Sequence, residues 1–166
     1  TDLRHSPLHD RHLRAGAKLA PFAGWEMPIQ YEGISVEHRA TRDSAGLFDV
    51  SHMGQIETSG PQVEELLQLL LSNDVAAIPV GGAQYALLCE EDGGVVDDLF
   101  TYLLDNERFL TVTNAANHAG DLERFCRFAE GRDVAVEDAR DHWAMLAIQG
   151  PDARTLLAAY AVVAPR

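Results

Sequence analysis

The clearest strand pattern in the chain lies in its middle third. Residues 85–89 form an apolar run, which ends in a polar turn cluster with two adjacent glycines. β-Branched and aromatic residues, which are typical of strands, resume over residues 95–104 and, after a second polar turn, over residues 109–113. This spacing predicts a meander of three strands.

Helical patterns and further strands flank this meander. Each predicted helix has apolar positions three and four residues apart, or opens with a residue that suits a first turn, such as Ser6, Ser35 or Asn114. The predicted helices cover residues 6–16, 36–45, 60–70, 114–131 and 152–159. The other predicted strands cover residues 47–53, 55–58, 134–137 and 143–149.

This order of elements predicts an α+β fold, in which helices pack on an antiparallel or mixed sheet. A chain of 166 residues with 46% hydrophobic residues can bury a core of its own. No segment boundary resembles a linker, so we expect residues 1–166 to form one region.

Two stretches depart from simple periodicity. Residues 19–31 hold two prolines and a glycine among large apolar and aromatic side chains, and they fit neither the helical nor the strand period. We expect them to form an irregular covering segment that helps to wall a cavity. Gly54 interrupts a strand pattern, which predicts a bulge or a close approach of the backbone to a ligand.

Charge narrows the classes of partner. The formal net charge is −13, which argues against nucleic acid or an anionic membrane as a partner. No apolar run is long enough to span a bilayer, so we expect no membrane contact. The two cysteines lack disulfide or metal-ligand spacing, which fits a reducing compartment.

Asp97 and Asp98 break the pattern of the strand that contains them, because acids are disfavoured in strand interiors. Breaks of this kind tend to mark functional positions. Successive side chains of a strand point to opposite faces, so one carboxylate must face inward or into a cleft. An equally acceptable alternative is that both lie at the solvent end of the strand.

Metal and serine chemistry are weaker candidates. Of the seven histidines, only His9 and His12 have a spacing typical of a zinc pair, and surface positions on a helix explain them more simply, so we expect no metal. Ser51 and His52 are strand neighbours that point apart, and their context lacks the sharp strand-to-helix turn that presents a nucleophilic serine.

The remaining candidate site is a carboxylate among aromatic and amide side chains. Strand alternation places Asp98 and Tyr102 on one face, and Tyr85, Asn114 and Asn117 lie in the adjoining predicted elements. A carboxylate can accept from an amine, aromatic rings can stack, and asparagine can donate and accept, which together suit a planar, nitrogen-rich heterocycle. Such a carboxylate is also a candidate for handling a proton or stabilising positive charge.

Five blocks of sequence then point to a family. They are Phe22-Ala-Gly-Trp-Glu-Met-Pro28, Glu37-His-Arg39, Ala45-Gly-Leu-Phe-Asp-Val-Ser-His-Met-Gly54, Gly93-Gly-Val-Val-Asp-Asp-Leu99 and Val112-Thr-Asn-Ala-Ala-Asn117. In this order and spacing they resemble the aminomethyltransferase, or T-protein, family of the glycine cleavage system. The resemblance covers nearly the whole chain.

The resemblance implies an enzyme that moves a one-carbon unit from the aminomethyl-lipoyl arm of a carrier protein to tetrahydrofolate, with release of ammonia. It implies that Asp98 is the catalytic carboxylate at the attacking folate nitrogen. It also implies that Met53, Tyr85, Tyr102 and Asn114 lie at the folate site. A cytoplasmic location is expected, or the mitochondrial matrix in a eukaryote.

Family members extend well beyond this length, so we expect an N-terminal part of the family that is inactive and self-associates when isolated. Two alternatives stay open. One is a folate-dependent demethylase of the same fold, and the other is a folate-binding module without catalysis.

Overall fold

The computed structural model describes residues 2–160, which fall into two compact units. Unit 2 is continuous and spans Met53–Trp143, whereas unit 1 joins the described residues before it to those after it. Helices occur together with antiparallel and mixed sheets, which confirms the predicted α+β class. No helix of the described residues is long and apolar enough to cross a bilayer.

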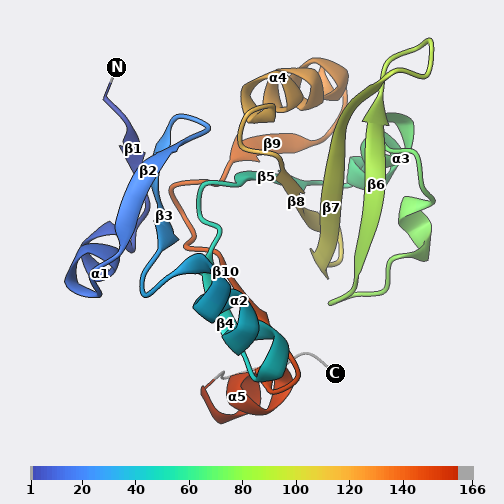
Figure 1. Ribbon diagram of the computed structural model, residues 1–166. Helices are drawn as coiled ribbons and strands as arrows, with labels where there is room; N and C mark the ends of the chain where they lie inside the picture. The colour runs from blue at the N-terminus through green and yellow to red at the C-terminus, as the bar shows by residue number, and fades with distance from the viewer. Residues whose placement is uncertain (1, 161–166) are drawn as a thin grey trace. The chain divides into compact units, whose positions relative to one another are not determined.

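Unit 2 is built on a five-stranded antiparallel sheet in the order β6-β7-β8-β5-β9 (Figure 1). The predicted meander is confirmed, because β6, β7 and β8 are successive neighbours in this sheet. The strands are β5 (Gly54–Ser59), β6 (Ala83–Cys89), β7 (Val95–Asp105), β8 (Arg108–Thr113) and β9 (Ala135–Asp138). The helices are α3 (Val63–Leu70), the short 3₁₀ helix η1 (Val75–Ala77) and α4 (His118–Ala129).

The two faces of this sheet differ sharply. Along β7, Leu99 and Thr101 are buried, while Asp98, Phe100 and Tyr102 are exposed, as the strand period requires. The buried face packs with α3 and α4 in one apolar core that includes Ile56, Leu66, Leu67, Leu88, Leu99, Phe109 and Phe125. The other face leaves a carboxylate and aromatic rings accessible.

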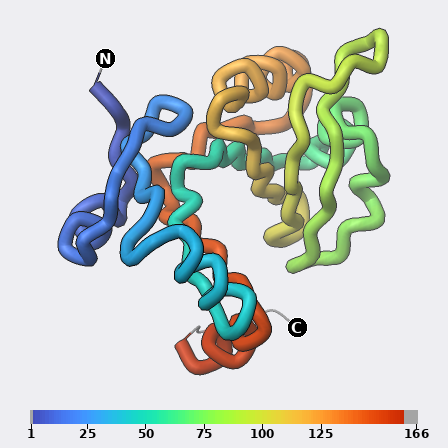
Figure 2. Tube along the Cα trace, in the orientation of Figure 1, coloured from blue at the N-terminus to red at the C-terminus, as the bar shows by residue number. Residues whose placement is uncertain are grey.

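The described residues of unit 1 form two small sheets and three helices. The first sheet has the order β1-β3-β2, and the second pairs β4 with β10. Figure 2 shows the red β10 returning to lie beside the turquoise β4, although the whole of unit 2 separates them in sequence. The elements are β1 (Arg4–His5), α1 (His9–Arg14), β2 (Lys18–Phe22), β3 (Trp25–Gln30), α2 (Ile34–Asp43), β4 (Gly46–Asp49), β10 (Leu146–Gln149) and α5 (Ala153–Tyr160).

The predicted irregular segment at residues 19–31 is wrong in its secondary structure, because β2 and β3 form a hairpin there. The chain turns at Ala23 and Gly24, whose φ angles of 47° and 83° suit a tight two-residue hairpin turn. Pro28 pairs with Leu19, next to an irregularity in the strand register, so its missing N–H costs little. The expectation of a cavity wall is confirmed, since residues 28–31 line a cavity of about 280 Å³ within unit 1.

Three predicted helix caps are also wrong. The Ser6 hydroxyl accepts from Leu8 N, and α1 begins only at His9. Helix α2 begins before Ser35, and the carboxylate of Glu37 reaches back to accept from Gly33 N at 2.8 Å. Helix α4 begins at His118 rather than Asn114, whose side chain binds carboxylates instead. The side chains of Ser6 and Asn114 hydrogen bond instead with aspartates that are distant in sequence, which spacing alone did not reveal.

Gly54 lies in an unbroken register with β8, so the predicted bulge is wrong. A close approach does occur, but by the protein's own side chains. A Cβ atom at this position would lie 2.0 Å from Thr113 Oγ1 and 2.1 Å from His118 Nδ1. The glycine therefore makes room for a buried histidine.

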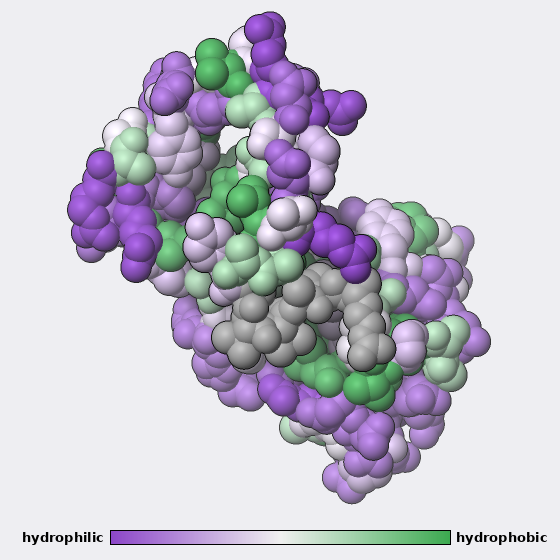
Figure 3. All heavy atoms as spheres, turned by 90° about the horizontal axis from the view of Figure 1, so that it is seen from below, coloured by the Kyte–Doolittle hydropathy of each residue, from purple (hydrophilic) through white to green (hydrophobic). Residues whose placement is uncertain are grey.

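Many large apolar side chains of the described residues are exposed, several of them in unit 1. Figure 3 shows such apolar atoms, in green, lying among polar ones on the face that it presents. In unit 1 the exposed large apolar residues include Leu13, Phe22, Ile34, Val36, Leu47, Phe48 and Leu146. Exposed apolar surface of this kind is consistent with association, which stays a prediction.

Candidate functional site

Asp97 and Asp98 point to opposite faces of β7. Asp97 is only 3% exposed and faces the helices, whereas Asp98 lies on the open face of the sheet. The alternative that both carboxylates occupy the solvent end of the strand is therefore wrong. Each carboxylate has its own set of partners, and Asn114 joins the two sets.

Asp98 is held by two side chains from neighbouring elements. Tyr85 Oη, on the adjacent strand β6, donates to Asp98 Oδ2 at 2.8 Å. Asn114 Nδ2, just after β8, donates to Asp98 Oδ1 at 3.0 Å. The hydrogen bond to Asp98, together with desolvation and the negative charge nearby, raises the pKa of Tyr85, so this phenol stays a donor at neutral pH. One partner on each oxygen fixes the carboxylate and leaves acceptor capacity free.

An aromatic row lies beside Asp98 on the same face. Phe100 lies between Tyr85 and Tyr102, with ring-centroid separations of 6.3 Å and 5.3 Å. All three rings are exposed, and burial of part of Tyr102 raises the pKa of its phenol. The rings offer flat, apolar surface next to a fixed carboxylate, as a planar heterocycle with N–H groups would require.

Asp97 lies on the opposite, buried face of β7. It accepts hydrogen bonds from Asn114 N at 3.0 Å, Asn114 Nδ2 at 2.8 Å and Asn117 Nδ2 at 2.7 Å. Burial acts to raise the pKa of Asp97, but these donors outweigh burial and lower it. Asp97 is therefore an ionised buried group that holds the turn between β8 and α4.

Asp121 is a site residue that the sequence reasoning missed. It lies in the first turn of α4, is fully buried, and has the Asp97 carboxyl group as a neighbour. Burial and Asp97 together raise the pKa of Asp121 to about 7. The available signal was an aspartate on the same helix face as Phe125, four residues on, which places an acid among core positions.

The structure brings together four of the five residues expected at the site, namely Asp98, Tyr85, Asn114 and, through the aromatic row, Tyr102. The fifth, Met53, immediately precedes β5, whose first residue pairs with Thr113. Its backbone thus lies near that of Asn114, and its side chain is half-buried.

Only one group of described residues has the composition of a metal site, and its geometry is unsuitable. His5 Nε2 and His9 Nε2 lie 3.4 Å and 3.6 Å from the same Glu26 oxygen. The two imidazole rings are stacked in parallel with centroids 3.9 Å apart, so an ion could not lie in both ring planes at once. The group is better described as one carboxylate shared by two imidazoles.

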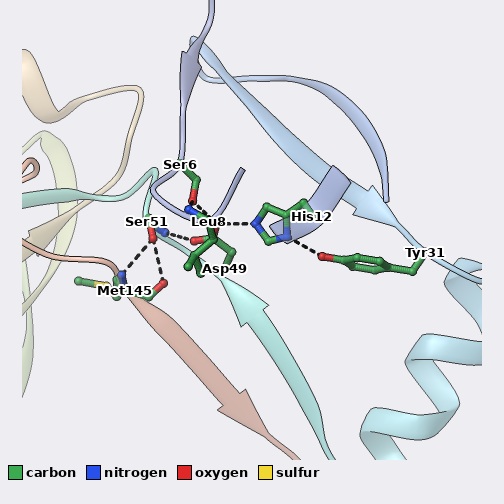
Figure 4. Close-up of polar contacts among 7 residues, drawn as sticks. All are labelled: Ser6, Leu8, His12, Tyr31, Asp49, Ser51 and Met145. Atoms are coloured by element: carbon green, nitrogen blue, oxygen red, sulfur yellow. Dashed lines mark hydrogen bonds and ion pairs between the residues drawn. The ribbon is translucent and has the colours of Figure 1, made fainter. Parts of the chain in front are cut away.

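A second polar network lies within unit 1 and centres on the buried carboxylate of Asp49 (Figure 4). Asp49 accepts from the Ser6 hydroxyl and from Ser51 N, and it hydrogen bonds with His12 Nε2 at 2.7 Å. His12 Nδ1 in turn lies 2.7 Å from Tyr31 Oη. Because its members come from β4, from α1 and from the residue that follows β3, this network links the small elements of unit 1.

Comparisons with known proteins place the chain in a family. A family model described as "GCVT N-terminal domain" matches residues 8–164. An aminomethyltransferase of Rubrobacter xylanophilus is 51% identical over 155 residues, which are 93% of this chain and 41% of that protein. An aminomethyltransferase of Desulfitobacterium hafniense is 48% identical over 157 residues, 95% of this chain and 43% of that protein.

A solved structure agrees with these matches. The crystal structure of glycine cleavage system aminomethyltransferase T from Bartonella henselae superposes with a TM-score of 0.86 at 39% identity, over 95% of this chain and 44% of that one. The chain thus spans less than half the length of the relatives that it matches. Because the family model covers almost all of its residues, the chain belongs to the GCVT N-terminal domain family.

Proposed function

We propose that the protein containing this chain is a tetrahydrofolate-dependent aminomethyltransferase of glycine cleavage. The observation that carries the proposal is the fixed carboxylate of Asp98 beside an exposed aromatic row, in a chain whose relatives are aminomethyltransferases. The donor is the aminomethyl group on the lipoyl arm of a carrier protein, and the acceptor is tetrahydrofolate.

The transfer balances without an oxidant or reductant. The carbon–sulfur bond to the lipoyl arm and the carbon–nitrogen bond to the amino group break, and two bonds form from that carbon to the folate nitrogens. The two hydrogens that leave those nitrogens go to the lipoyl sulfur and to the departing amine, which is released as ammonia.

The residues of the chain suit this reaction. Asp98 would accept a hydrogen bond from the folate nitrogen that attacks, and its charge would stabilise the positive charge that develops on the one-carbon unit. Tyr85 and Asn114 would keep the carboxylate in position, so that little reorganisation is needed during the reaction. Phe100 and Tyr102 would supply stacking surface for the planar ring.

The test is Asp98→Asn in the full-length protein, assayed for tetrahydrofolate-dependent ammonia release from the aminomethyl carrier. Loss of one preorganised charge at the reacting centre is expected to lower turnover by on the order of 10²–10³. Asp105→Asn is the matched control, because Asp105 is an exposed carboxylate of the same strand, away from the aromatic row. Near-normal turnover of Asp98→Asn would refute the assigned role.

The identity of the one-carbon donor distinguishes this proposal from its two alternatives. A folate-dependent demethylase would form methylenetetrahydrofolate from a methylated amine, and a non-catalytic module would bind tetrahydrofolate without turnover. Transfer from the aminomethyl carrier, and from no methylated amine, is the expected result. The carrier as a partner and the cytoplasmic location follow from the same proposal and stay predictions.

A further inference from the structure

Asp121 is a buried acid for which the proposed reaction has no direct use. Its side chain is fully buried in the first turn of α4, and neither carboxyl oxygen accepts from an N–H or hydroxyl group of the described residues. Burying an ionised carboxylate without a donor is costly, so the group must either carry a proton or share one.

Asp97 is the neighbour that can share this proton. Asp97 already accepts three hydrogen bonds from Asn114 and Asn117, which stabilise its ionised form. Two adjacent carboxyl groups cannot both ionise cheaply, so the proton belongs on the partner that lacks donors, which is Asp121. A hydroxyl on Asp121 that donates to Asp97 satisfies both side chains.

Asp97 also connects this pair to the open face of the sheet. Asn114 Nδ2 lies 2.8 Å from Asp97 Oδ1 and 3.0 Å from Asp98 Oδ1, so a single amide group bridges the buried and the exposed carboxylate. The hydrogen bond to Asp97 fixes the position of that amide. Anything that moves Asp97 therefore moves the group that orients Asp98.

We propose that Asp121 is a positioning residue, whose protonated carboxyl group donates to Asp97 and thereby holds Asn114 and Asp98 in place. This inference deepens the proposed function and rests on it. The order of contacts runs from Asp121 to Asp97, then to Asn114, and finally to Asp98.

The arrangement makes the site sensitive to pH near neutrality. Burial and Asp97 raise the pKa of Asp121 to about 7, while the charge of Arg124, on the same helix, acts in the opposite direction. As pH rises through this value, Asp121 loses its proton and two carboxylates face each other in a buried space. Their repulsion would displace Asp97 and loosen Asn114, and transfer should decline.

The proton itself is tested without any assay of activity. Infrared difference spectroscopy of the full-length protein follows the carbonyl stretch of protonated carboxyl groups against pH. Wild type should show such a band that disappears near pH 7, and Asp121→Asn should lack it. Glu123→Gln, an exposed acid of the same helix, is the matched control and should keep it. Absence of the band in wild type, or its persistence in Asp121→Asn, would overturn the proposal.

The positioning role is tested by the pH profile of transfer. Asp121→Asn keeps a donor toward Asp97 at every pH, so it should stay active and lose the decline above about pH 7. Asp121→Ala removes the donor and should lower kcat by about tenfold or more, with a smaller change in KM, because it disturbs the orientation of Asp98 more than binding. Equal activities of Asp121→Asn and Asp121→Ala would refute positioning by a shared proton.

Failure of the proposed function would look different. If wild type transfers nothing from the aminomethyl carrier while the infrared band titrates near pH 7, the proposed function falls, and the positioning role with it. The shared proton of Asp97 and Asp121 would stand.

Discussion

A methyl group added at Gly54 would lie 2.0 Å from Thr113 Oγ1 and 2.1 Å from His118 Nδ1. Non-bonded atoms do not approach so closely, so either β5 or both the Thr113 hydroxyl and the His118 ring must move by more than about 1 Å to restore ordinary van der Waals separations. The ring has little freedom, since it is fully buried and hydrogen bonds with the Thr113 hydroxyl at 2.9 Å. Its other nitrogen lies 3.3 Å from Asp138 Oδ1.

The cost of Gly54→Ala follows from these contacts. Overpacking a well-filled site costs about 1–3 kcal/mol. Loss of the buried hydrogen bond between Thr113 and His118 would add about 1–3 kcal/mol, because both groups would be left without solvent. We therefore expect the free energy of unfolding to fall by about 2–6 kcal/mol.

Urea unfolding followed by far-UV circular dichroism measures this loss. Gly120→Ala is the matched control, because Gly120 lies in α4, its added Cβ would meet no atom within 4 Å, and its φ is not positive. Alanine is the better helix former, so this control should gain up to about 1 kcal/mol. If Gly54→Ala is as stable as wild type, the close packing of His118 on β5 is not the reason for the glycine.

Three further predictions concern ionised side chains and the isolated chain. Burial acts to raise the pKa of Asp49, but hydrogen bonds from Ser51, Ser6 and His12 lower it below 3.8. The contribution of Asp49 to stability is therefore present above pH 3.8 and is lost as pH falls through the lowered pKa. Urea unfolding between pH 2 and 6 should show a loss of stability in acid that Asp49→Asn lacks, and parallel profiles would contradict this. Hydrogen bonds from Arg140 lower the pKa of Asp138 to about 2, so Arg140→Ala should return it toward 3.8 in an NMR titration, and an unchanged value would exclude Arg140 as the cause. Residues 1–166 match 41% of the Rubrobacter relative over 155 residues; expressed alone, they should self-associate and release ammonia far more slowly than a full-length enzyme. A monodisperse monomer with full turnover would contradict this.

The sequence pattern predicted the sheet of unit 2 well, for a physical reason. Because β7 has a core face and an open face, its side chains alternate strictly, and a one-residue slip would bury the wrong set. Alternation also showed that Asp97 and Asp98 face apart. It could not show which one is buried, because that depends on Asn114 and Asn117, which follow a further strand of the chain.

The hairpin of β2 and β3 was missed because proline normally argues against a strand. Short strands tolerate it where a ladder hydrogen bond is not needed, and only the pairing partner reveals such positions. Likewise, Ser6 suggested a cap, but its hydroxyl is used by Asp49, which lies far along the chain. Local signals failed where a side chain had a distant partner.

For the candidate site, too, local patterns predicted some features and missed those that depend on distant residues. Residue types and alternation were enough to gather Asp98, Tyr85 and Tyr102 as a surface for a planar ligand. The role of each at a folate site came only from resemblance to a family. Asp121 was missed because helical periodicity treats an acid as a polar position, whereas here α4 turns it toward another acid.

The interrupted course of unit 1 has a consequence during synthesis on the ribosome. Its strand β4 can pair with β10 only after the whole of unit 2 has been made, which at about 5–20 residues per second takes on the order of 5–20 s. Unit 2 is continuous and can form its core as soon as it emerges from the ribosome. Until β10 has been made, the backbone groups of β4 lack their partner strand, and the side chains of Leu47 and Phe48, which stay exposed after folding, are open to a chaperone that binds nascent apolar segments.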